Sequence, residues 1–185
     1  MISVDVRISQ EMVKNMVGKT FKKYRCDPFA FTNTVTQIIG LYIGDDVYKI
    51  TNIQEPVDYF GTPDDIAVFR CNYADNTEIK SAFVETEQMD TPVDTVIDEV
   101  RIINEHQEVY ENGVKTYDVW LTRGIIFVTA GREISFEKEN IPFSEEIEIR
   151  RGYDLINNYS DVNEFTKDWD DGITARAVRE IVTIK

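Results

Sequence analysis

The chain has 185 residues, 42% of them hydrophobic and 11% aromatic, and this composition excludes a disordered polypeptide. Its 34 acidic and 20 basic residues give a formal net charge of −14, which opposes direct binding to nucleic acids and anionic membranes. No apolar run approaches the ~20 residues of a transmembrane helix, and the first residues lack the pattern of a signal peptide. We therefore expect a single domain, 1–185, that is cytoplasmic and does not contact membranes.

The first part of the chain predicts a short helix followed by strands. Ser9 is a suitable N-cap for a helix over about 10–17, and Gly18 is a suitable residue to end it. From Thr20 to Tyr73 the pattern is mostly that of strands, and Gly44-Asp45 predicts a hairpin turn between two of them.

The second part of the chain predicts an antiparallel meander. Residues 91–103 begin like a helix but are rich in β-branched side chains, and we favour a strand that enters a long hairpin. Asn112-Gly113 is the strongest turn signal, because a type I′ turn needs positive φ at both positions. The meander is expected over about 97–150, with Gly124 at a bulge.

Short helical segments are expected over 153–169, followed by a strand or helix at 173–184. The predicted fold class is α+β, made predominantly of antiparallel sheet, with short helices near both ends.

Few residues offer nucleophilic or metal chemistry. Cys26 and Cys71 have neither metal-ligand nor redox spacing, so we expect two reduced thiols in strands. His106 is the only histidine, which argues against a histidine-assisted nucleophile and against a zinc site. We therefore expect no metal and no cofactor for the main interpretation.

One set of residues resembles the signature of a large nuclease superfamily. Pro63-Asp64 and, after thirteen intervening residues, Glu78-Ile79-Lys80 follow its Pro-Asp…(Asp/Glu)-x-Lys order. In that interpretation Asp64 and Glu78 hold Mg²⁺ or Mn²⁺ beside the scissile phosphate, and Lys80 stabilises charge. The alternative is a surface turn followed by an ordinary exposed strand. It is favoured, because acids and lysines are abundant here and no helix precedes Asp64.

The negative charge is concentrated in residues 51–100, which hold 12 acidic and two basic residues. A candidate partner-binding face consists of Asp58, Tyr59, Glu85, Glu87, Asp90, Asp94, Asp98 and Glu99. In a helix, three of these aspartates line one column, whereas in an extended chain the acids scatter over both faces. The functional interpretation is a row of carboxylates that imitates phosphates in a basic groove; the simpler one is a solvated surface.

The N-terminal region carries the opposite charge. Four cations interleaved with aromatic residues, Lys19, Lys22, Lys23 and Arg25, are typical of phosphate contact and base stacking. A half-solvated strand is the more economical explanation. The bipolar charge layout also suits self-association as a homodimer.

Four segments resemble parts of uncharacterised proteins from mobile elements of Firmicutes: Thr122–Phe127, Ser135–Lys138, Phe143–Glu146 and Gly152–Ile156. The small, acidic, motif-poor chain is also similar in character to phage anti-CRISPR inhibitors, which share no common fold. The resemblance implies a non-catalytic inhibitor that docks on a basic nucleic-acid-binding protein, such as a Cas nuclease. The alternatives are a divalent-metal-dependent nuclease and an oligomeric accessory protein of a mobile element.

Overall fold

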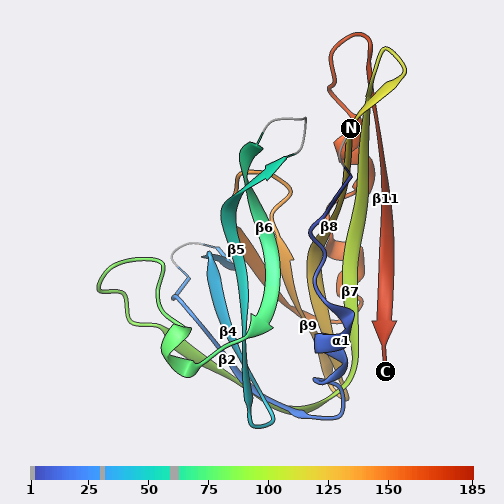
Figure 1. The fold of residues 1–185 in the computed structure, drawn as a ribbon. Coiled ribbons are helices and arrows are strands. Elements are labelled where there is room, and N and C mark those ends of the chain that lie inside the picture. Colours follow the sequence, from blue (N-terminus) through green and yellow to red (C-terminus); the bar gives the residue numbers. More distant parts are fainter. Residues whose placement is uncertain (1–2, 30–31, 59–62) are drawn as a thin grey trace.

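The computed structural model describes residues 3–29, 32–58 and 63–185, which form an open, mostly antiparallel sheet (Figure 1). The strands are β1 (Val4–Asp5), β2 (Thr20–Cys26), β3 (Thr34–Thr36), β4 (Ile38–Ile43), β5 (Asp46–Asp58), β6 (Pro63–Tyr73), β7 (Met89–Glu111), β8 (Val114–Thr129), β9 (Arg132–Lys138), β10 (Glu146–Gly152) and β11 (Ile173–Ile184). The helical elements are α1 (Gln10–Lys14) and the 3₁₀ helices η1 (Asn76–Glu78), η2 (Leu155–Asn158) and η3 (Val162–Thr166). Among the described helices, none combines the length and apolarity needed to cross a membrane.

The long strand β7 joins two layers of the sheet. Its first residues pair with β2, which continues through β4 and β5 to β6. From Ile97 onward it pairs with β8, and β11 lies along its other side. The two layers face each other across the core, as Figure 1 shows. One continuous strand therefore fixes the relative position of both layers.

Aromatic side chains from both layers fill the core. Phe21 of β2 lies 5.0 Å from Phe127 of β8, measured between ring centroids, and Tyr24 lies 5.5 Å from Phe136 of β9. All four are buried. An irregularity in the pairing of β2 between Phe21 and Lys23 shifts the alternation of the strand, so that Phe21 and Tyr24 both face the core while the lysines and the arginine lie outside it.

Several predictions of local structure are confirmed. Ser9 accepts a hydrogen bond from the Met12 amide at the start of α1. Asn112 and Gly113 have φ angles of 48° and 81°, as the type I′ turn requires. Strands β7 to β10 form the predicted meander, and residues 91–103 are strand. Both cysteines are free and buried.

Other predictions are corrected by the structure. The helical content is smaller than the α+β prediction implies: α1 has five residues, and the segments near the C-terminus are 3₁₀ helices. Residues 78–80 are not a strand, because Glu78 ends η1. At 173–184, where a strand or a helix was expected, the structure has a strand of twelve residues, β11, which pairs with β7. Pairing with β7 along its whole length accounts for the choice of strand over helix in this segment.

Candidate functional site

A loop over residues 79–88 projects away from the layer of β2, β4, β5 and β6, at the left of Figure 1. Its start is fixed by η1, in which Asp75 and Glu78 form a reciprocal capping box. Glu78 also accepts a hydrogen bond from Lys49 Nζ of β5 at 2.5 Å. The Lys49 ammonium holds the pKa of Glu78 below its usual value. This loop therefore leaves the sheet from a well-bonded turn.

The base of the 79–88 loop is anchored by buried contacts. Ile79 packs so closely on Gly40 of β4 that a β-carbon there would lie 2.7 Å from Ile79 Cγ2. Buried Asp27 accepts hydrogen bonds from Ser81 Oγ at 2.9 Å and from the Ala82 amide at 3.2 Å. Ser81 Oγ in turn accepts from the Phe83 amide. These contacts and hydrogen bonds therefore fix the loop as far as residue 83.

The tip of the same loop is apolar and exposed. Phe83 is 55% exposed and Val84 is 92% exposed. The next residue, Glu85, is exposed and has a positive φ of 64°, so the chain turns sharply there. Glu87 is exposed as well. The loop thus presents an aromatic and an aliphatic side chain beside two carboxylates.

The predicted acidic face is only partly available for a partner. Asp90, at the start of β7, accepts hydrogen bonds from Lys23 at 2.5 Å and from Arg25 at 2.6 Å. The Arg25 hydrogen bond contributes most to lowering the pKa of Asp90 to about 2. Glu99 forms ion pairs with Arg101 and Lys185. The charges of these two carboxylates are therefore largely neutralised within the chain.

The remaining predicted partner-binding residues that the structure describes lie in three separate places. Glu85 and Glu87 lie on the 79–88 loop, and Asp94 and Asp98 lie exposed along β7. Asp58 lies apart from them at the end of β5, and Tyr59 falls outside the described residues. The structure thus gathers the loop carboxylates but does not join the described members of this set into one face.

Each of the four predicted nucleic-acid-binding cations has a carboxylate partner. Lys19 pairs with Asp46 at 2.7 Å and Lys22 with Asp45 at 3.4 Å. Lys23 and Arg25 share Asp90, as described above. A phosphate backbone would have to displace these carboxylates, so the structure favours the half-solvated strand.

The residues of the nuclease signature are far apart. Asp64 lies at the beginning of β6, and Glu78 follows its end. At about 3.3 Å per residue, the strand separates them by roughly 30 Å. Glu78 is already paired with Lys49, and Lys80 lies exposed on the 79–88 loop. The two carboxylates cannot share one Mg²⁺ or Mn²⁺ ion in this fold.

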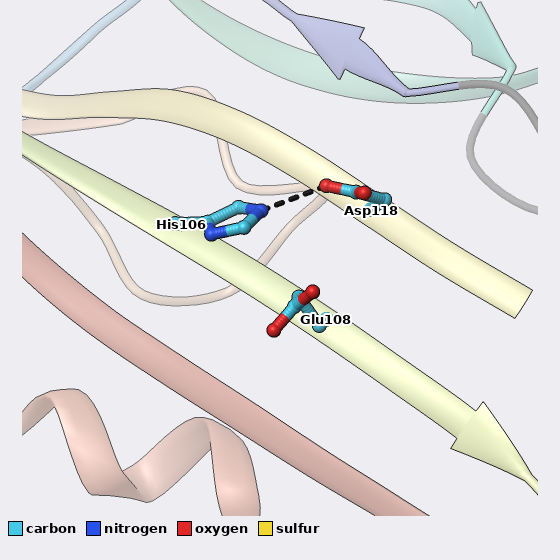
Figure 2. Close-up of side chains that lie close together, drawn as sticks. All are labelled: His106, Glu108 and Asp118. Atoms are coloured by element: carbon cyan, nitrogen blue, oxygen red, sulfur yellow. Dashed lines mark hydrogen bonds and ion pairs between the residues drawn. The ribbon is translucent and has the colours of Figure 1, made fainter. Parts of the chain in front are cut away.

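A second polar cluster lies on the hairpin of β7 and β8 (Figure 2) and was missed by sequence reasoning. His106 Nε2 lies 2.7 Å from Asp118 Oδ1, and Glu108 stands beside them, as Figure 2 shows. The ligand atoms of all three residues lie within 4.8 Å of one another, which is compatible with a metal site. Lys115, however, bonds both Glu108 and Asp118. A cation could use these carboxylates only after displacing that ammonium group.

Stacking also fixes the position of His106. Its ring lies 4.4 Å from that of Trp120 at an angle of 3°, and the Arg7 guanidinium covers the same indole. The hydrogen bond with His106 lowers the pKa of Asp118, and Lys115 lowers that of Glu108. The predicted turn alone would place His106 opposite Val119. A register shift between Val109 and Tyr110 brings Trp120 opposite His106 instead, so the turn signal could not have revealed the stack. This cluster is a structural network of the hairpin.

Comparisons of the chain with protein-family models, with curated proteins and with solved structures give no match. The function therefore has to be inferred from surface geometry. Among the features described, the 79–88 loop stands out because its base is fixed while Phe83 and Val84 at its tip are exposed. Within the described residues, the neighbouring Glu85 and Glu87 form no ion pair.

Proposed function

We propose that this chain is a non-catalytic binding protein that docks its 79–88 loop on a basic, nucleic-acid-handling enzyme and inhibits it. A Cas nuclease is the target class that we propose to test first. The observation that carries this proposal is the exposure of Phe83 and Val84 on an anchored loop, beside Glu85 and Glu87.

The loop has the physical properties of an interface anchor. Aromatic side chains that enter a pocket contribute much of the binding energy at protein interfaces. The bonds that Asp27 accepts from Ser81 and Ala82 order the loop before binding, which reduces the entropy lost on association. Glu85 and Glu87 add a negative field that accelerates encounter with a positively charged partner.

In this proposal the carboxylates that attract the partner are those of the 79–88 loop, and not a row of aspartates on β7. Asp90 is occupied by Lys23 and Arg25 and so is a weak phosphate mimic. Asp94 and Asp98 remain exposed and contribute to the long-range field. The wide separation of Asp64 and Glu78 favours binding over metal-dependent cleavage.

The test is a direct binding measurement with purified Cas9, with and without guide RNA, at low and at moderate salt. We expect salt-sensitive binding, and Phe83→Ala with Val84→Ala should weaken it roughly tenfold or more. The matched control is Val114→Ala, which removes an exposed side chain from the hairpin tip. We expect the control to bind like the unmodified protein.

A DNA-cleavage assay completes the test. Inhibition of Cas9 should be lost in the loop double variant and in Glu85→Lys with Glu87→Lys, because the latter reverses the loop charge. Unchanged affinity and inhibition in both double variants would reject the 79–88 loop as the docking element.

A further inference from the structure

Strand β11 forms a free edge of the sheet. It pairs with β7 from Ile173 opposite Glu111 to Ile184 opposite Val100, without a register shift. Among the described strands, none pairs with its other side, which forms the right-hand boundary in Figure 1. An edge of this length presents a row of unpaired backbone N–H and C=O groups.

The edge of β11 carries the charged residues Arg176, Arg179 and Glu180 but has few other features that block strand pairing. It contains no proline and no bulge, and it exposes Val178 to 61% and Ile181 to 47%. By contrast, the edge strand β6 is partly covered, since the Ala67 amide donates to the Pro142 carbonyl of a neighbouring loop. The β11 edge is thus more available to another strand than the β6 edge.

We propose that two copies of this chain associate through β11, paired antiparallel about a two-fold axis at Val178. In this register Val178 lies opposite its own copy, and Arg176 lies opposite Glu180 of the second copy. Since residues two apart share a face, the exposed valine lies between two ion pairs. On the opposite face Ile181 lies opposite Ala175, so both exposed apolar side chains are covered.

Charge complementarity supports a second copy as the occupant. Arg176 stacks over Tyr110 and has no carboxylate partner among the described residues. Glu180 is 3.5 Å from Arg7 and accepts from Asn104, which hold its carboxylate in place while leaving it partly exposed. Two-fold symmetry then forms the Arg176–Glu180 pair twice.

The same charges select the register. A two-fold axis at Arg176, Arg179 or Glu180 would place each of these residues opposite its own copy, and like charges directly opposite are destabilising. An axis at Val178 instead places opposite charges together. Because the 79–88 loop belongs to the other layer, the dimer presents two such loops (Figure 1). This inference does not depend on what the loops bind.

A cysteine cross-link tests the register directly. Directly opposite residues have β-carbons about 4.5–5.5 Å apart, close to the separation of a disulfide. Val178→Cys should therefore form a disulfide-linked dimer on mild oxidation. The matched control is Thr174→Cys, on the same face but opposite Val182, which should remain largely monomeric on a non-reducing gel. Cys26 and Cys71 are buried and should not contribute.

Charge reversal measured by sedimentation gives a second readout. The unmodified protein should sediment as a dimer, and Arg176→Glu should weaken the dimer roughly tenfold, since two pairs become repulsive. Adding Glu180→Arg should restore it, with circular dichroism confirming the fold of each variant. A monomeric unmodified protein, equal cross-linking of both cysteine variants, or no restoration by the second change would each overturn the proposal.

Discussion

Gly124 is the position at which a single methyl group should be least tolerated. A register shift near Asn104 leaves Arg123 as the bulged residue, and a β-carbon at Gly124 would lie 2.4 Å from the Phe136 carbonyl oxygen and 2.5 Å from Tyr159 Oη. We expect Gly124→Ala to lower the free energy of unfolding by about 1–3 kcal/mol, as overpacking does. Equilibrium unfolding in denaturant measures this change in the free energy of unfolding. Gly131→Ala, with nothing within 4 Å, is the control, and equal stability of both variants would contradict the clash.

Lys138 should make stability depend on pH above neutrality. It is buried and donates to the Ile141 carbonyl, and burial lowers its pKa to about 7. Between about pH 7 and the unfolded pKa of about 10.4, the unfolded chain binds more protons at this lysine than the folded chain does. The free energy of unfolding therefore rises with pH over this range. Relative to Lys138→Met, the free energy of unfolding should rise by up to about 1.4 kcal/mol per pH unit. Parallel pH profiles of the two proteins would contradict this.

At the scale of an element, the order of the 79–88 loop depends on Asp27. This residue accepts from Ser81 and from the Ala82 amide, and both bonds cross from the end of β2 to the loop. Asp27→Ala should therefore speed hydrogen exchange at Ala82 and Phe83 while leaving the core amides protected. Asp45→Ala, at an exposed hairpin turn, is the control. Unchanged exchange in the Asp27 variant would show that the loop is ordered by other contacts.

At the scale of the whole molecule, ion pairs across the sheet should make the fold sensitive to acid. Arg25 and Lys23 lower the pKa of Asp90 to about 2, below its unfolded value of about 3.9. Its contribution is thus present above about pH 4 and lost as the pH falls towards 2. The stability difference between the unmodified protein and Asp90→Asn should shrink over that range in denaturant titrations. Added salt should reduce this stability difference, because the Asp90 carboxylate is partly exposed and its ion pairs are screened.

The control for this prediction is Asp171→Asn, which changes an exposed carboxylate in the turn before β11. We expect Asp171→Asn to change the free energy of unfolding less than Asp90→Asn does at pH 5. A difference for Asp90→Asn that grows on acidification would reverse the assignment of Asp90 as a stabilising ion-pair partner.

Much of the sheet could be predicted because its signals are local. The positive φ required at Asn112-Gly113 and the turn at Gly44-Asp45 fixed two hairpins, and Ser9 fixed the start of α1. The site was predicted less completely. The acids of the 79–88 loop were recognised, but Phe83 and Val84 were not, because exposure of an apolar side chain depends on which strands surround it.

By itself the sequence determined the strand-rich meander, the reduced cysteines and the concentration of negative charge, since each follows from residue type and spacing. Only the tertiary structure decided that the first residues of β7, from Met89 to Val96, pair with β2, that Asp64 and Glu78 lie apart, and that Asp90 is neutralised. These outcomes depend on pairing between segments distant in the chain. Such pairing is set by burial of whole strand faces in a shared core, which local sequence patterns do not specify.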